Sequence, residues 1–340
     1  MLIEILPRSS SCFCLWLGGI LGAFVCAFFC FILFIRIAQR YLQAGVREYI
    51  EDLHAQKGST PTMGGLVIVG LVSIAMLFLY VATRDVRLLS LLFLLVGSAA
   101  IGAWDDSCKI FWGRGIVEQQ KFVGQILVAL GALGIWYLGD VATFPNSILV
   151  AFGYPFSVHL GKIGYILWGL WVILSTYNCV NFTDGLDGLA GGVLAVNFAF
   201  FGLFALLSGE YHLALVAACL LGSVLAFLWF NMYPAKVFMG DVGALSLGAV
   251  LAMIALMLRI ELAILAVGMV FVLEGVSVIL QIVWMRVFGR RLFLLAPLHH
   301  HFEKRGIPEV AITNRAILLT LLMALTAAVL YLYPFSCSVS

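Results

Sequence analysis

The chain has 340 residues, of which 64% are hydrophobic and only 11% charged, and its formal net charge is +2. Soluble domains contain about 45–50% apolar and about 25% charged residues, so this composition excludes a water-soluble globular fold. The small net charge also excludes a strongly basic surface, and no nucleic-acid partner is expected. The eight cysteines contain no CxxC pair, and we interpret them as small hydrophobic residues rather than as disulfides or zinc ligands.

The apolar residues occur in blocks long enough to cross a hydrocarbon core as a helix, which takes about 17–25 residues. Backbone groups in lipid must be hydrogen-bonded within the segment, so unbroken blocks favour helices over a barrel. The first block is too long for a signal peptide and lacks a cleavage site, which indicates an uncleaved anchor. The sequence predicts an all-α, polytopic integral membrane protein with a single transmembrane domain over 1–340. The ten expected spans are 13–35, 64–83, 88–104, 122–139, 163–180, 188–207, 213–230, 242–258, 262–283 and 316–333.

The orientation follows from the Lys and Arg residues, which are enriched in cytoplasmic loops. Fourteen of the 19 basic residues lie in the connections after the odd-numbered spans, and five lie on the other side. Both termini are therefore expected outside, in the periplasm. The expected cytoplasmic loops are about 36–63, 105–121, 181–187, 231–241 and 284–315.

One polar cluster falls in each of these five loops. The clusters are Lys57–Gly65 (KGSTPTMGG), Asp105–Lys109 (DDSCK), Asn178–Ala190 (NCVNFTDGLDGLA), Phe238–Gly243 (FMGDVG) and Pro297–Glu303 (PLHHHFE). The acidic residues in the loops on the opposite side are scattered and form no motif. Because unrelated capping residues would occur on both sides, the pattern predicts one composite site at the membrane–cytosol boundary.

The five clustered aspartates are oxygen donors of the kind that Mg²⁺ prefers, often in company with substrate phosphates. Carboxylates repel phosphates, so a phosphate-binding site of this kind needs a metal ion or nearby cations. The available aspartates are Asp105, Asp106, Asp184, Asp187 and Asp241, and the available lysines are Lys57, Lys109 and Lys121.

Other interpretations remain open for each cluster taken singly. The Asp105–Asp106 pair is also typical of helix capping or snorkelling, and DGLDG also suits a simple turn or a calcium-type loop. The three histidines also suit a transition-metal site, and single lysines often only fix topology. Glu274 lies inside a span, where an ionisable group is functional by default, but it also suits a helix break beside Gly275.

Together these motifs resemble those of the phospho-N-acetylmuramoyl-pentapeptide-transferase family, within the superfamily of polyprenyl-phosphate N-acetylhexosamine-1-phosphate transferases. The resemblance extends from about Lys57 to Glu303. TPTMGG, NxxNxTDGLDGLA and PLHHHFE are specific to the family, whereas DDxxK is shared by the superfamily. Two positions depart from its pattern: Ala244 stands where Ser is usual, and Leu294 stands where a basic residue is usual.

The resemblance implies Mg²⁺-dependent transfer of phospho-MurNAc-pentapeptide from its UDP form to undecaprenyl phosphate at the cytoplasmic face of the bacterial inner membrane, with release of UMP. It implies Asp241 as the principal metal ligand, with Asp184 as a second one. Asp105 and Asp106 would engage or deprotonate the lipid phosphate, and all three of Asp105, Asp106 and Asp241 are expected to be catalytic. Direct attack by the lipid phosphate is favoured over a route through a phosphorylated Asp105.

The resemblance also implies a set of substrate-binding residues. Those expected to orient the nucleotide are Asn178, Asn181, Asp184 and Asp187. Those expected to shape the uridine pocket are Lys57, Thr62, Asn231 and Phe238, with Phe238 stacking on uracil. Those expected to hold phosphates or the sugar-peptide end are Lys121, His299, His300 and His301.

Two rival functions are kept. A UDP-GlcNAc:polyprenyl-phosphate GlcNAc-1-phosphate transferase would share the DDxxK motif, although TPTMGG and HHHFE argue against it. A membrane transporter would carry several ionisable groups at mid-membrane and signs of duplicated halves; here only Glu274 lies deep, and no duplication is evident. A homodimer is left open.

Overall fold

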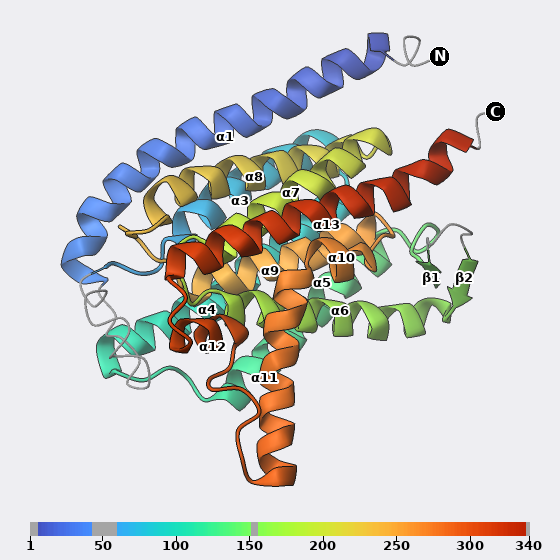
Figure 1. Ribbon diagram of the computed structural model, residues 1–340. Helices are drawn as coiled ribbons and strands as arrows, with labels where there is room; N and C mark the ends of the chain where they lie inside the picture. Colours follow the sequence, from blue (N-terminus) through green and yellow to red (C-terminus); the bar gives the residue numbers. More distant parts are fainter. Residues whose placement is uncertain (1–5, 43–59, 151–155, 338–340) are drawn as a thin grey trace.

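A computed structural model describes residues 6–42, 60–150 and 156–337 of the chain, which are predominantly helical (Figure 1). Within these described ranges, ten helices are long and apolar enough to cross a membrane, which confirms the predicted number of spans. They are α1 (Leu6–Tyr41), α3 (Gly65–Thr83), α4 (Val86–Trp112), α5 (Glu118–Gly139), α6 (Gly161–Thr183), α7 (Leu189–Leu207), α8 (Tyr211–Asn231), α9 (Gly240–Met257), α11 (Met269–Phe288) and α13 (Glu309–Cys337). Two short helices complete the set, α10 (Ala263–Val267) and α12 (Leu298–Lys304).

Helix α9 forms the centre of the bundle, and α1 lies at its periphery (Figure 1). Within the apolar stretch of each helix, 94% of the residues are buried in α9 but only 17% in α1. α9 packs against α3, α4 and α6, whereas α1 lies along α8. Because the outward-facing side chains of α1 are large and apolar, this helix suits contact with lipid.

Small residues bring the starts of α3 and α9 and the end of α4 close together. A Cβ added to Gly102 of α4 would lie 2.4 Å from the backbone oxygen of Asp241, and one added to Gly65 of α3 would lie 2.3 Å from Cα of Gly243. A side chain at either glycine would force the helices apart. The polar clusters at these helix ends are therefore held in one place by backbone contact.

The ninth predicted span, 262–283, is not one continuous helix. The chain forms α10, breaks at Gly268 and continues as α11, which projects from the bundle in Figure 1. The carbonyl of Val267, freed by the break, accepts a hydrogen bond from the buried Asn197 amide at 3.2 Å. The interpretation of Glu274 as marking a break beside Gly275 was wrong, since both residues lie within α11.

A two-stranded antiparallel hairpin adds a small β element that the all-α prediction did not include. Strand β1 (Ser147–Val150) pairs with β2 (Phe156–His159) in the connection between α5 and α6. Arg259, after α9, donates from Nη2 to the backbone oxygen and to Oγ of Ser147, both at 2.9 Å. The hairpin is thereby tied to the turn that precedes α10.

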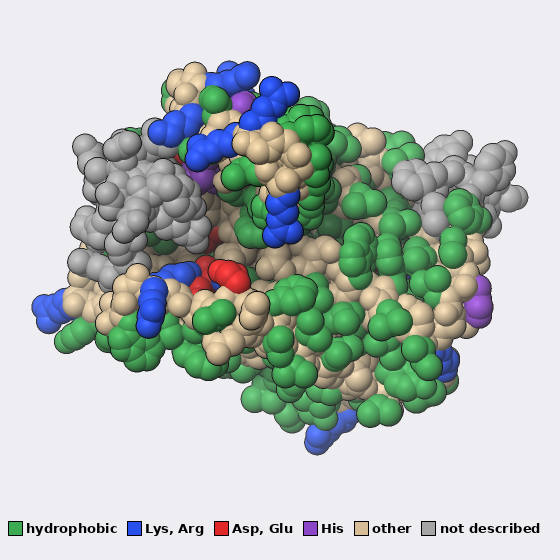
Figure 2. Space-filling model, turned by 90° about the horizontal axis from the view of Figure 1, so that it is seen from below, with side chains coloured by type: hydrophobic (Ala, Val, Ile, Leu, Met, Phe, Trp, Pro, Cys, Tyr) green, Lys and Arg blue, Asp and Glu red, His purple; other side chains and the backbone are tan. Residues whose placement is uncertain are grey.

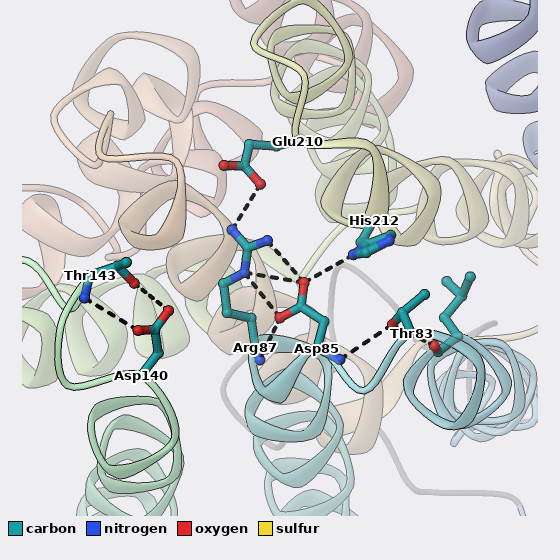
Figure 3. Close-up of polar contacts among 8 residues, drawn as sticks. Thr83, Asp85, Arg87, Asp140, Thr143, Glu210 and His212 are labelled. Carbon is teal, nitrogen blue, oxygen red and sulfur yellow. Dashed lines mark hydrogen bonds and ion pairs between the residues drawn. The ribbon is translucent and has the colours of Figure 1, made fainter.

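A charged network joins two turns at the end of the bundle away from the polar clusters (Figure 3). Asp85 caps α4 and pairs with Arg87, which also reaches Glu210 at 2.8 Å. His212 Nδ1 lies 3.0 Å from Asp85 Oδ2. Burial by itself would raise the pKa of Asp85, but hydrogen bonds from Arg87 and His212 hold that pKa below its usual range. The network fastens the α3–α4 turn to the start of α8.

Candidate active site

Three buried carboxylates lie together where α4 and α9 meet. Asp105 and Asp106 lie on the last turns of α4, and Asp241 lies on the first turn of α9. One oxygen atom from each residue lies within 4.8 Å of the others, a spacing that suits a shared metal ion. Each of the three residues is at most 6% exposed, so the simple capping and snorkelling interpretations do not describe them.

Two lysines supply the positive charge for this trio. Lys109 Nζ lies 2.7 Å from Asp105, 3.4 Å from Asp106 and 3.1 Å from Asp241. Lys121, on the first turn of α5, is buried and pairs with Asp241 and, at 3.5 Å, with Asp105. Since burying several like charges together is unfavourable, the two ammonium groups stabilise the three carboxylates.

Backbone groups fix the carboxylates from the other side. Asp105 Oδ1 accepts the N–H of Ile116 at 2.8 Å, and Asp106 Oδ2 accepts the N–H of Val242 at 3.2 Å. Gly240 has a φ of +73°, and a Cβ there would lie 2.5 Å from Asp106 Oδ2. Glycine therefore fits this position both by its backbone conformation and by the space available.

The TPTMGG segment lies against the start of α9 through main-chain hydrogen bonds. Phe238 N–H donates to Pro61 O at 2.8 Å, and Gly64 N–H donates to Phe238 O at 2.8 Å. A Cβ at Gly240 would lie 3.0 Å from Thr62 Oγ1, so the buried Thr62 side chain lies close to the trio. Two motifs far apart in the sequence thus form one wall of the site.

The DGLDG turn is held by residues of several helices. Asp187 Oδ2 accepts the N–H of Ala235 at 2.9 Å, and Asn231 Oδ1 accepts the N–H of Gly188 at 3.0 Å. Asn231 also donates to Val237 O at 2.8 Å. The segment 231–241 therefore runs from the DGLDG turn to Asp241 and joins the two polar regions.

The histidine motif forms α12, and its first two rings are buried. Glu274 of α11 accepts the backbone N–H of His299 at 3.2 and 3.3 Å, and its Oε2 lies 3.3 Å from His299 Nδ1. Neither ring nitrogen of His299 has hydrogen-bond geometry to a described residue, and a Cβ at Gly185 would lie 2.3 Å from Nε2. His300 pairs with Glu303 at 2.7 Å. Glu274 thus anchors α12 beside the DGLDG turn.

His301 is oriented differently from the other two histidines. Its Nδ1 accepts the N–H of Leu294 at 3.1 Å, so a neutral ring carries its proton on Nε2. Burial and, secondarily, the charge of Arg305 lower the pKa of His301 below its usual value. Leu294, which departs from the family pattern, contributes here through its backbone.

Not every residue expected at the site lies in the carboxylate trio. Asp184 follows the end of α6 and is not one of the three metal-capable carboxylates. Asn178 and the buried Gln125 form an amide pair, with Asn178 Nδ2 donating to Gln125 Oε1 at 3.1 Å. Asn181 lies half-buried on the last turn of α6. Lys57 lies outside the described residues.

Sequence reasoning missed three residues that support the site: Gln125, Glu309 and Thr313. Glu309 and Thr313 of α13 both bind the backbone of Asp187. Gln125 lies in an apolar span, where a buried amide is a signal that could have been noticed. Glu309 and Thr313 at a helix start give only an ordinary capping signal.

One face of the molecule is hollowed (Figure 2). Figure 2 shows acidic side chains within the hollow and Lys and Arg side chains gathered along its side. An anionic ligand would meet cations at the edge before reaching the carboxylates, a charge arrangement that suits phosphates if a divalent cation is bound at the floor.

Comparison with known proteins shows which proteins this chain is similar to. A model described as glycosyl transferase family 4 matches residues 88–259. Proteins named phospho-N-acetylmuramoyl-pentapeptide-transferase are similar to the chain: one from Bacillus velezensis is 37% identical over 270 residues, covering 78% of this chain and 81% of the relative. One from Solidesulfovibrio magneticus is 39% identical over 299 residues, covering 82% of each. One from Geobacillus kaustophilus is 38% identical over 269 residues, covering 78% and 81%.

Proposed function

We propose that this chain, which belongs to the phospho-N-acetylmuramoyl-pentapeptide-transferase family, transfers phospho-MurNAc-pentapeptide from UDP-MurNAc-pentapeptide to undecaprenyl phosphate. The chain is a multi-pass membrane enzyme of the phosphotransferase class, active in peptidoglycan synthesis. The observation that carries the finer proposal is the buried trio of Asp105, Asp106 and Asp241 beside two lysines. Transfer between two phosphates needs charge neutralisation and positioning, which such a group of charges can provide.

The trio suits Mg²⁺ by its chemistry. Its donors are all carboxylate oxygens, the ligands that this ion prefers. Three carboxylates and two ammonium groups leave about one uncompensated negative charge when all are ionised, so a cation is favoured there. Asp105, Asp106 and Asp241 would hold the ion, with Asp241 as the principal ligand and Asp184 as a second one. When bound, Mg²⁺ would neutralise charge on the diphosphate.

The reaction follows from this placement. An oxygen of the undecaprenyl phosphate attacks the phosphorus that bears the sugar, a new P–O bond forms, and the bond to the uridine-bearing phosphate breaks. UMP leaves with the bonding electrons. Lys109 and Lys121 stabilise the negative charge on the phosphate oxygens, while Asp105 or Asp106 orients the acceptor or takes its proton. This single displacement needs no covalent enzyme intermediate.

The remaining motifs suit the donor substrate. Thr62, Asn231 and Phe238 would shape the uridine pocket beside the DGLDG turn, and Lys57 would join them from the preceding segment. Asn178, Asn181 and Asp187 would orient the nucleotide. His299, His300 and His301 would bind phosphates or the sugar-peptide end. His299 Nε2, which has no hydrogen-bond partner among the described residues, supports that assignment.

The lipid acceptor must reach the same place from the bilayer. An apolar cavity of about 260 Å³ lies between α11, α12 and α13, lined by residues that include Leu189, Leu273, Leu298 and Leu319. Its mostly apolar lining suits part of an isoprenoid chain, and Glu274 and Arg315 also line it. We place the site on the cytoplasmic face of the bacterial inner membrane, with both termini in the periplasm.

The test is transfer by the purified, lipid-reconstituted protein. With UDP-MurNAc-pentapeptide, undecaprenyl phosphate and Mg²⁺, we expect a lipid-linked sugar and an equal amount of UMP. Chelation with EDTA should stop both, and added Mg²⁺ should restore them. The matched control replaces the donor by UDP-GlcNAc under the same conditions. Transfer from UDP-GlcNAc but not from the MurNAc donor would favour the GlcNAc-1-phosphate transferase instead.

A further inference from the structure

Helix α13 holds the turn that carries Asp187. It binds both the N–H and the carbonyl of Asp187. Glu309 Oε1 accepts the N–H of Asp187 at 2.6 Å, and Thr313 Oγ1 donates to the carbonyl of Asp187 at 3.1 Å. Glu309 begins α13, and Thr313 follows one turn later on the same face. A charged acceptor at a short distance forms a stronger hydrogen bond than a neutral one.

Two side-chain contacts of the turn engage other groups than the backbone of Asp187. The Asp187 side chain accepts from Ala235, and Gly188 N–H donates to Asn231, but neither contact engages the N–H or carbonyl of Asp187. Gly188 has a φ of +75°, a conformation that glycine adopts readily. In the peptide between Leu186 and Asp187, the carbonyl of Leu186 accepts the N–H of Leu189 at 3.2 Å. The N–H of Asp187, on the other side of the same peptide, is held by Glu309.

The chain between α12 and α13 links this contact to the histidine motif. Only residues 305–308 separate the end of α12 from Glu309, and the His299 ring lies against Gly185 at the other end of the same turn. The segment from α12 to the first turns of α13 therefore contacts the DGLDG turn at both of its ends. A change at Glu309 should alter the turn without removing any group that touches the carboxylate trio.

We propose that Glu309 is a positioning residue that holds the DGLDG turn, through the Asp187 N–H and together with Thr313, in the shape that binds the nucleotide end of the UDP-sugar donor. The inference rests on the proposed function for the identity of the donor. The required property of Glu309 is an oxygen that accepts a hydrogen bond, not its negative charge. A glutamine keeps that oxygen, whereas an alanine does not.

The experiment compares E309A, E309Q and the isosteric Thr313→Val in the reconstituted full-length protein. For E309A we expect the KM for the UDP-sugar donor to rise about tenfold, as expected for a lost hydrogen bond to a charged group. The KM for the polyprenyl phosphate should stay within about twofold. E309Q should restore the donor KM to within about threefold, and Thr313→Val should raise it by a smaller factor than E309A. The matched control is Asn314→Ala, an exposed residue on the same turn of α13, which should change neither KM.

Equal rises in both KM values, or a glutamine as defective as the alanine, would overturn the inference. If E309A fails to fold, Thr313→Val decides: an unchanged donor KM would overturn it. Hydrogen exchange separates this inference from the proposed function, because E309A should speed exchange in the peptide that covers residues 183–190 without any substrate present. A wild-type protein without transferase activity would refute the proposed function alone, and unchanged exchange would refute the role of Glu309 alone.

Discussion

Each charged side chain at the site is stabilised by ion pairs with the others. Asp241 pairs with both Lys109 and Lys121, and each lysine also pairs with Asp105. In a buried place the removal of one charge leaves its partners without compensation, which costs more than the pair itself contributes. A neutral substitution at Asp241 therefore changes both the place for a cation and the position of two lysines.

For Asp241→Asn we expect transferase activity to fall by at least about 100-fold, comparable to the loss of one preorganised electrostatic group. An amide keeps the shape of the side chain but is a poor ligand for a hard dication. The measurement is UMP release at several Mg²⁺ concentrations, with size-exclusion chromatography to verify the fold. Asp140→Asn is the matched control, because the Asp140 carboxylate, at a helix end away from the trio, binds the local Thr143. Activity within a few-fold of wild type, with unchanged Mg²⁺ dependence, would remove Asp241 from the metal site.

Between elements, polar contacts fasten the turns that apolar packing alone leaves free. At the end of the bundle away from the site, Asp85, Arg87, Glu210 and His212 join the α3–α4 turn to the start of α8 (Figure 3). The pKa of Asp85 is held below its usual range. A carboxyl group with a depressed folded pKa stabilises the fold above its unfolded pKa, and this contribution is lost as the pH falls through the folded pKa.

We expect Asp85→Asn to lower the Tm by a few degrees at pH 7, a size typical of one partly exposed ion pair. The difference from wild type should shrink below about pH 4 and vanish once Asp85 itself is protonated. Thermal melting in detergent between pH 7 and pH 3.5 measures this. The Asp85→Asn variant and its reference protein both carry His212→Gln, so that titration of the histidine does not contribute to the difference. Arg87 stays charged over this pH range, and Glu210 is present in both proteins. A Tm difference that stays constant over this pH range would contradict the prediction.

The architecture of the whole molecule sets which faces of the membrane its loops meet. An even number of spans puts the two ends of the chain on one side, as Figure 1 shows for α1 and α13. The described residues of the five polar clusters lie at the opposite end, and the Lys and Arg residues of the sequence are concentrated in the same connections. The positive-inside tendency predicts that this end faces the cytoplasm.

Topology is tested with single cysteines in a background without the native ones. We expect Lys236→Cys and Lys304→Cys to react with a membrane-impermeant thiol reagent only from the cytoplasm. Arg84→Cys and Ser208→Cys should react only from outside. All four positions are exposed, so differences in labelling report the side of the membrane and not burial. Labelling of positions 236 and 304 from opposite sides would refute the ten-span topology.

The sequence by itself determined the membrane class, the number of spans and the motifs. Apolar blocks of spanning length can only be helices in lipid, and the ten spans were confirmed. The hairpin escaped prediction because its four-residue strands are too short for a clear alternation. The break at Gly268 escaped because its free carbonyl is satisfied by Asn197, a residue distant in the chain.

Only the tertiary structure decided which polar residues meet. Asp105, Asp106 and Asp241 come together because Gly102 lets α4 touch the backbone of α9, a contact between residues more than 130 positions apart. Glu309 reaches Asp187 across a similar distance. Local sequence specifies spans through hydrophobicity, which each residue carries by itself. The geometry of the site depends on where small residues permit two helices to pack closely. Close packing requires matching surfaces on both helices, so the sequence of one helix alone does not specify it.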